Sequence, residues 1–143
     1  MFGVISTAVF DRSINTIYAM GGAAQFIALS MKDGSTIWTL FLNVTASVDP
    51  TLLSNYAALT LYNDTVYVPF ASHCDIGDYQ GRLIAISVHT RSVRSVFYPS
   101  IGPGGIAFGG GIWGSGGVAI GTALLSDAIW QRYQPSRRVD QLL

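Results

Sequence analysis

The sequence predicts an all-β fold in which one four-stranded unit is repeated. Three observations predict it: the chain has no Glu and a single Lys, it is rich in Gly and in β-branched and aromatic residues, and one pattern of short strands occurs twice. The missing residue types are good helix formers, whereas the abundant ones favour strands and turns. Half of the 143 residues are apolar, which is enough material for a hydrophobic core.

The first copy of the unit is predicted over residues 3–50. Its strands are expected at residues 5–10, 16–20, 25–30 and 35–42. Turn-forming residues separate them, at residues 11–13, at Gly21 and Gly22, and at Asp33 and Gly34. Each strand is rich in β-branched or aromatic side chains, as a short strand requires.

The second copy is predicted over residues 51–100 and carries an insertion. Its strands are expected at residues 58–62, 65–70, 82–88 and 93–98. The two copies are offset by 49 residues at Tyr18 and Tyr67 but by 57 at Leu29 and Ile86. About eight extra residues therefore lie between the second and third strands of the second copy, around residues 71–79. Insertions into a repeat form loops, and loops often carry function.

Apolar residues on both faces of the strands favour a propeller over a half-exposed sheet. Phe26 and Ala28 alternate with Ile27 and Leu29, so neither face of this strand is polar. Blades stacked around an axis bury both faces, and a four-stranded repeat of about 50 residues is typical of them. We therefore predict a partial β-propeller of about 2.5–3 four-stranded antiparallel blades. Because propellers close with more blades, the expected partners are the remaining blades or another copy of the chain.

The last third of the chain is predicted to be a partial third blade followed by an unrelated end. Residues 101–121 are Gly-rich and continue the propeller fragment that begins at residue 1. Residues 122–143 lack the strand pattern and are predicted to be an atypical tail, helical or disordered.

Charge and cysteine content exclude several classes of partner. The formal net charge is zero, so neither nucleic acid nor an anionic membrane surface is expected as a partner. Residues 95–126 carry no charge and are long enough to cross a bilayer, but their many glycines disfavour a helix, so no membrane span is expected. With Cys74 as the single cysteine, the chain has no internal disulfide.

Two stretches resemble a known family. The residues Phe26-Ile27-Ala28-Leu29, followed by Asp33-Gly34-Ser35-Thr36-Ile37-Trp38, are similar to the repeat signature of pyrroloquinoline-quinone (PQQ) propellers, with Ser30 in place of the usual Asp. The segment from Gly109 to Ile120 resembles the Gly-Gly-x-x-Trp segment of quinoprotein alcohol dehydrogenases. The resemblance covers about residues 3–121.

The resemblance implies what the complete protein does and where it works. Intact members of the family are quinone-dependent oxidoreductases acting on a small alcohol or sugar, and they typically work outside the cytoplasm, in the periplasm or extracellular space. A propeller site is assembled from several blades, so the chain alone is expected to be an inactive fragment. The alternative is a non-catalytic propeller that serves as a protein-binding or scaffold module.

The resemblance also implies candidate cofactor-binding residues for PQQ and calcium. Trp113 corresponds to the Trp that stacks on the quinone, the alternative being that it packs between blades. Ser72 begins the segment Ser72-His73-Cys74-Asp75, which lies where the family places a carboxylate ligand of its calcium ion, so Asp75 is the candidate metal ligand. Asp78 could serve equally, and a solvated turn Asp is the alternative for both. The family's cysteine pair and catalytic aspartate match nothing here, so no catalytic residue is assigned.

Other motifs do not predict a function. The pattern Gly109-x-Gly111-x-x-Gly114 fits the dinucleotide fingerprint but lacks a βαβ context and an acidic residue about 20 positions on. His73, Cys74 and Asp75 are adjacent on one short loop, and adjacent residues rarely share one tetrahedral ion.

Overall fold

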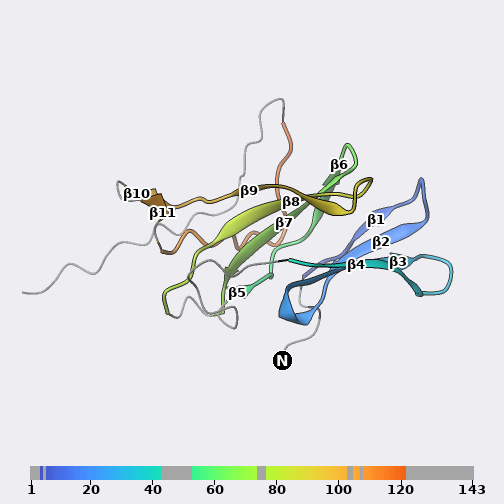
Figure 1. The fold of residues 1–143 in the computed structure, drawn as a ribbon, viewed down its shortest axis with the longest axis horizontal. Coiled ribbons are helices and arrows are strands. Elements are labelled where there is room, and N and C mark those ends of the chain that lie inside the picture. The colour runs from blue at the N-terminus through green and yellow to red at the C-terminus, as the bar shows by residue number, and fades with distance from the viewer. Residues whose placement is uncertain are drawn as a thin grey trace, which may run out of the picture.

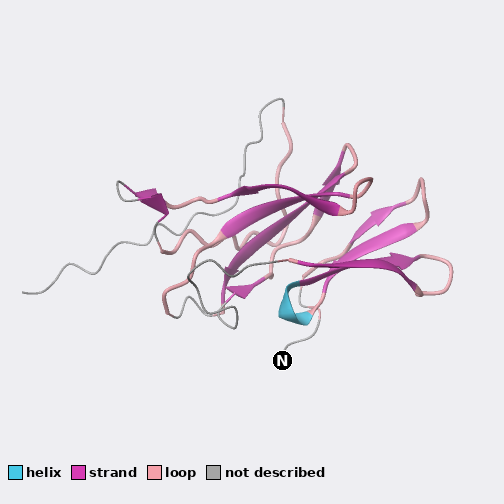
Figure 2. Ribbon diagram, viewed as in Figure 1, coloured by secondary structure: helices cyan, strands magenta, loops and turns pink. Residues whose placement is uncertain are grey.

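The protein is described by a computed structural model over residues 4, 6–42, 53–73, 77–102, 105–106 and 108–121. Two antiparallel sheets pack against each other, and a short hairpin lies beyond the second sheet (Figure 1). Strands and loops make up these residues apart from one turn of 3-10 helix, Gly22–Ala24 (Figure 2). The predicted all-β class is confirmed, and no helix in this part of the chain is long and apolar enough to cross a membrane.

The first sheet is a four-stranded meander in the order β1-β2-β3-β4. Its strands are β1 (Val9–Asp11), β2 (Thr16–Met20), β3 (Gln25–Ser30) and β4 (Thr36–Phe41). The predicted second and third strands have the observed bounds. The first was wrong in its bounds, because residues 6–8 pair with no strand whereas Asp11 pairs with Thr16 across the hairpin. The Asp11 side chain then accepts hydrogen bonds from Ser13, which close the turn.

The second sheet has the same meander with a divided first strand. Its strands are β5 (Leu53–Ser54), β6 (Thr60–Tyr62), β7 (Thr65–Ser72), β8 (Arg82–Ser87) and β9 (Ser92–Phe97). Both β5 and β6 pair with β7, at its end and its start respectively.

The division of this first strand was not predicted, and Pro69 accounts for it. Pro69 lies in the part of β7 between the two pairings and has no N–H to continue the ladder. Its carbonyl oxygen instead accepts a hydrogen bond of 2.5 Å from the Asn55 side chain. Asn55 therefore takes the place of a strand partner where the backbone ladder is broken.

Equivalent irregularities in the two sheets confirm the repeat. The β3–β4 register shifts after Ala28, and the β8–β9 register shifts after Ala85, which is the equivalent residue. The amide of Met31 donates to Asn15, and the amide of Val88 donates to Asp64, again at equivalent positions. The two sheets therefore share a β-bulge and a backbone hydrogen bond at equivalent positions, as two copies of one repeat would.

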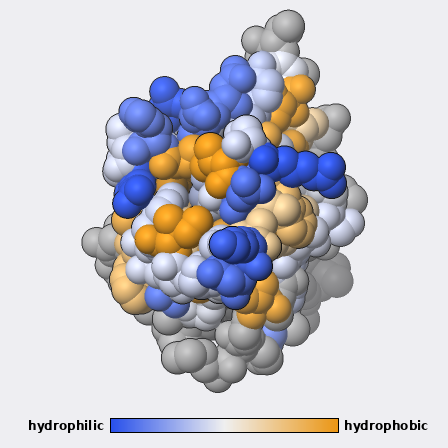
Figure 3. Space-filling view, turned by 90° about the vertical axis from the view of Figure 1, so that its right-hand side faces the viewer, coloured by the Kyte–Doolittle hydropathy of each residue, from blue (hydrophilic) through white to orange (hydrophobic). Residues whose placement is uncertain are grey.

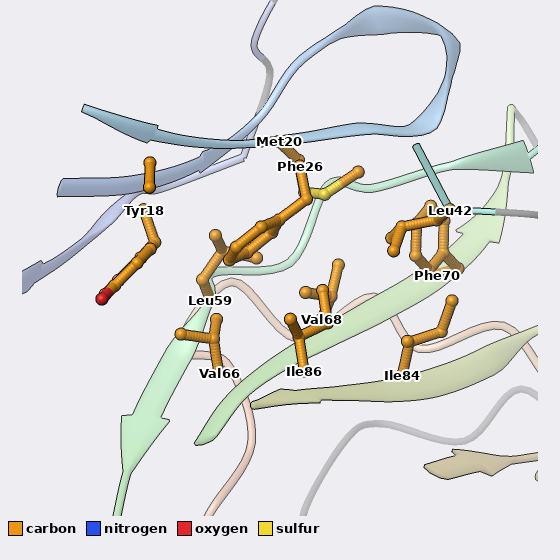
Figure 4. Close-up of a cluster of buried hydrophobic side chains, with 11 residues drawn as sticks. Tyr18, Met20, Phe26, Leu42, Leu59, Val66, Val68, Phe70, Ile84 and Ile86 are labelled. Atoms are coloured by element: carbon orange, nitrogen blue, oxygen red, sulfur yellow. The ribbon is translucent and has the colours of Figure 1, made fainter. Parts of the chain in front are cut away.

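The main hydrophobic core lies between the two sheets (Figure 4). Phe26 is fully buried, and its ring lies 5.8 Å from that of Tyr18 and 5.4 Å from that of Trp38. Aliphatic side chains of β7 and β8 close the core from the other side: Val66, Val68, Ile84 and Ile86. Each such side chain contributes about 1.5–3 kcal/mol on burial, so this contact between sheets stabilises the pair.

The other face of the second sheet is covered by the Gly-rich segment. Leu83 of β8 packs with Ile112 and Val118, both of which are buried. Because Ile84 and Ile86 face the first sheet, β8 is buried on both faces, as predicted for a propeller strand. Within the expected partial third blade, the strands described are β10 (Ile101–Gly102) and β11 (Gly105–Ile106), which form a two-stranded hairpin. The predicted tail, residues 122–143, lies outside the described residues.

The outer face of the first sheet has no neighbour among the residues described and keeps apolar side chains exposed. Phe10 is 55% exposed, Ile37 46% and Phe41 69%. The side of the molecule that carries the turns of this sheet likewise shows apolar side chains between strongly hydrophilic ones (Figure 3). Contiguous exposed apolar surface of this kind marks a candidate interaction surface.

Candidate functional site

Backbone hydrogen bonds bring the Gly-rich segment to the end of β7. The amide of Ile112 donates to the carbonyl of Phe70 at 3.2 Å. Two further bonds join Gly109 to the chain before β8, with Tyr79 as acceptor at 2.7 Å and Gly81 as donor at 2.8 Å. The segment is thereby held beside the loop that contains the insertion.

Glycines make this close approach possible. A β-carbon at Gly81 would lie 1.9 Å from the carbonyl oxygen of Gly110, which no side chain could tolerate. A β-carbon at Gly111 would lie 2.6 Å from Nε1 of Trp113 and 2.9 Å from the Tyr79 hydroxyl. The missing side chain at Gly111 therefore leaves room for the edge of the Trp113 ring.

Three rings form a continuous stack at this place, which we call the aromatic stack: Trp113, Tyr56 and His73. The Tyr56 ring lies 5.6 Å from that of Trp113, with 25° between their planes. The His73 ring lies 6.1 Å from that of Tyr56, at 15°, and meets it at the Tyr56 hydroxyl. The separation between the Trp113 and Tyr56 rings is within the range of favourable offset stacking. The stack joins residues that are far apart in the sequence.

Polar contacts distinguish the members of the aromatic stack. The Tyr56 hydroxyl and Nδ1 of His73 share a hydrogen bond of 2.5 Å, whose direction depends on the imidazole tautomer. Nε1 of Trp113 is buried and has no hydrogen-bond partner in the described part of the chain. A buried donor without an acceptor is unfavourable.

No family model and no curated protein matches this chain. Among solved structures, a europium-containing methanol dehydrogenase matches 67% of this chain with a TM-score of 0.51 and 22% identity. BamB from Moraxella catarrhalis matches 68% with a TM-score of 0.49 and 17% identity. The methanol dehydrogenase has a PQQ-like propeller fold.

This chain has a PQQ-like propeller fold. The match covers 15% of the methanol dehydrogenase and 28% of BamB, so the chain spans a minor part of either protein. The predicted fold is thus confirmed by two repeated sheets and by structural similarity. The activity, substrate and partners of a complete propeller are not given by the fold.

The site residues predicted from the sequence differ in their burial and in their contacts. Trp113 is half-buried and stacks on Tyr56. Ser72 is fully buried as the last residue of β7, where it pairs with Leu53, and its hydroxyl donates to the His73 carbonyl at 3.4 Å. Asp75 lies outside the described residues, and Asp78 is exposed. No metal-binding group of three or more His, Cys, Asp or Glu side chains occurs among the residues described.

A buried arginine lies at the start of β8, close to the chain that contacts the Gly-rich segment. Nε of Arg82 donates to the Gln80 carbonyl at 3.2 Å, and its guanidinium lies 5.5 Å from the centre of the Tyr98 ring. Burial lowers the pKa of Arg82 below its usual value, and the Tyr98 phenol partly opposes this effect. Arg82 remains charged at neutral pH and holds the start of β8 through these contacts.

Tyr56 and Tyr79 were missed by the sequence analysis. Tyr56 precedes the predicted strand in a stretch with no turn motif, and it reaches the site only because β5 pairs with the end of β7. The position of Tyr79 depends on the insertion that follows β7. Their aromatic character was the available signal, but aromatic residues are frequent throughout this chain.

Proposed function

We propose that this chain is part of a quinoprotein-type β-propeller whose complete form is a quinone-dependent oxidoreductase for small alcohols or sugars. The supporting observation is that Trp113 stacks on Tyr56, whose hydroxyl hydrogen-bonds His73, the residue after Ser72. The resemblance assigned Trp113 and Ser72 to one cofactor site although they are 41 residues apart in the sequence. The chain alone is expected to be inactive, because further blades complete such a site.

The residues present fit the flat part of a quinone cofactor. Tyr56 covers one face of the Trp113 ring, so the cofactor would stack on the other face. When bound, PQQ would supply the two-electron oxidation of the substrate.

A hard cation is the second expected component. Asp75 or Asp78, both in the insertion, would provide carboxylate oxygen, which suits calcium. The methanol dehydrogenase to which the chain is similar contains europium by its name, so a trivalent lanthanide is an equally suitable probe. By the same resemblance, we expect the complete protein to work in the periplasm or outside the cell.

Cofactor titration tests this function directly. PQQ is added to the full-length propeller protein with Ca²⁺ or Eu³⁺, and binding is followed by isothermal titration calorimetry. We expect saturable binding that Trp113→Ala weakens at least tenfold, an effect of about 1.4 kcal/mol. Tyr62→Ala, at the exposed end of β6, is the matched control and should bind as the wild type does. Equal binding by the wild type and Trp113→Ala would reject the function.

A scaffold function is the second candidate, and the exposed outer face of the first sheet favours it. Phe10 and Phe41 on that sheet are more than half exposed. If this face binds another copy of the chain, sedimentation velocity should show an oligomer that Phe41→Asp dissociates and Trp113→Ala does not affect. A wild-type monomer at all concentrations would argue against self-assembly through this face.

A further inference from the structure

Tyr56 is connected to β7 both through its backbone and through its hydroxyl. It lies between β5 and β6, outside any strand. The residue before it, Asn55, is buried and donates a hydrogen bond from its side chain to the carbonyl of Pro69 in β7. At the other end, the Tyr56 hydroxyl shares a hydrogen bond with Nδ1 of His73, the residue that follows β7. A tyrosine held at both places has few orientations left to it.

The backbone around Trp113 does little to fix its indole ring. Trp113 lies outside the strands described, and glycines stand around it at positions 109–111, 114, 116 and 117. Glycine leaves the backbone more conformational freedom than any other residue. The hydrogen bond from the Ile112 amide to the Phe70 carbonyl holds the neighbouring residue in place, but it does not hold the ring.

The Tyr56 ring supplies the support that the backbone does not. Its centre lies 5.6 Å from that of the Trp113 ring, with 25° between the planes, so the two rings are stacked. Gly111 keeps the space beside the indole free of a side chain, because a β-carbon there would lie 2.6 Å from Nε1 of Trp113. One face of the indole is therefore covered, and the orientation of its plane follows that of the Tyr56 ring.

We propose that Tyr56 is a positioning residue of the cofactor site, which fixes the plane of the Trp113 indole before the cofactor binds. This inference rests on the proposed function, in which the cofactor stacks on the other face of the indole. A ring that is already ordered loses little freedom on binding, and such preorganisation increases affinity. Loss of the Tyr56 ring should therefore weaken binding although Tyr56 itself does not contact the cofactor.

Substitutions at Tyr56 test the positioning role in the calorimetric titration of the full-length propeller protein with PQQ and Ca²⁺. We expect Tyr56→Leu to weaken binding about two- to tenfold, which is the contribution of one stacked aromatic pair. Tyr56→Phe keeps the stacked ring and should restore most of the affinity. Tyr62→Leu, at the exposed end of β6, is the matched control and should bind as the wild type does.

The outcomes separate the positioning role from the proposed function. If Tyr56→Leu binds as the wild type does while Trp113→Ala binds about tenfold more weakly, the positioning role is wrong and the proposed function stands. Equal weakening in Tyr56→Phe and Tyr56→Leu also overturns the positioning role, because the ring is then not the part of Tyr56 that matters. If Trp113→Ala binds as the wild type does, the proposed function itself is wrong.

The order of the indole in the cofactor-free protein is measured without any variant. NMR relaxation of the ¹⁵N-labelled indole N–H of Trp113 gives its order parameter, which is about 0.85 for a rigid N–H group and below about 0.6 for a flexible one. We expect the rigid value in the wild type, as for Trp38, whose ring lies 5.4 Å from that of Phe26. Tyr56→Leu should lower the value for Trp113 alone. A flexible Trp113 indole in the wild type overturns the positioning role whether or not the cofactor binds.

Discussion

The amide of Ile112 donates a 3.2 Å hydrogen bond to the carbonyl oxygen of Phe70. This bond joins the Gly-rich segment to β7 and makes the second sheet the middle layer of three. Ile112 is buried against Leu83 on one face of the sheet, while Phe70 contributes to the core on the other. The position of Trp113, one residue after Ile112, follows from this attachment.

Replacing Phe26 by Ala should destabilise the chain more than any exposed substitution. Phe26 is fully buried between the sheets, so its removal leaves a cavity and should cost about 3–5 kcal/mol. Phe41→Ala on the exposed outer face should change stability by about 0.5 kcal/mol or less. Urea unfolding measures both values, and similar losses for the two variants would mean that the sheets do not pack through this core.

Gly81→Ala should detach the Gly-rich segment from the second sheet. Its β-carbon would overlap the backbone of Gly110 at 1.9 Å, and overpacking of this kind costs about 1–3 kcal/mol. Gly116→Ala is the matched control, since no atom lies within 4 Å of its β-carbon. Amide exchange of Gly109 and Ile112 should become faster in Gly81→Ala alone. Unchanged protection in that variant would refute the close approach.

Thr60→Val should weaken the attachment of Val118 to β6. The Thr60 hydroxyl accepts from the Val118 amide at 3.0 Å and donates to its carbonyl at 3.3 Å, as a strand partner would. Loss of these bonds should cost about 1 kcal/mol and speed exchange of the Val118 amide. Thr39→Val, at an exposed position of β4, serves as the control. Exchange that is equally slow in both variants would contradict the contact.

The turn between β3 and β4 should respond to acid through Asp33. Hydrogen bonds from the Ser35 side chain and amide, at 2.7 and 3.1 Å, hold the pKa of Asp33 below its usual value. Because the folded-state pKa is the lower one, the stabilisation is present above the ordinary carboxyl pKa and is lost as the pH falls through the folded value. Ser35→Ala removes the side-chain bond and should raise the pKa of Asp33.

Carboxyl chemical shifts followed by NMR against pH measure this effect. Ser92→Ala, in the equivalent turn of the second sheet, should leave the pKa of Asp33 unchanged. Identical titration of Asp33 in the wild type and Ser35→Ala would show that the side-chain bond does not form in solution.

The sequence predicted much of the repeat and little of the site. β2 and β3 were predicted with their observed bounds, because turn residues such as Asp33 and Gly34 flank regular apolar runs. The division at Pro69 was missed, since it depends on the Asn55 side chain, which reaches Pro69 only in the folded sheet. Trp113 was identified through a family resemblance, but its partner Tyr56 could not be, because contact between them depends on the packing of the Gly-rich segment.

The most direct test of the account is whether Trp113 contacts Tyr56 in solution, since this contact sets the position of Trp113 in the proposed cofactor site. Nuclear Overhauser effects between the two rings measure this in a chain with selectively labelled Trp and Tyr. The account predicts strong effects between the Trp113 indole and the Tyr56 ring protons, and their loss in Gly81→Ala. Absence of these effects in the wild-type chain, with the signals of both rings assigned, would contradict it.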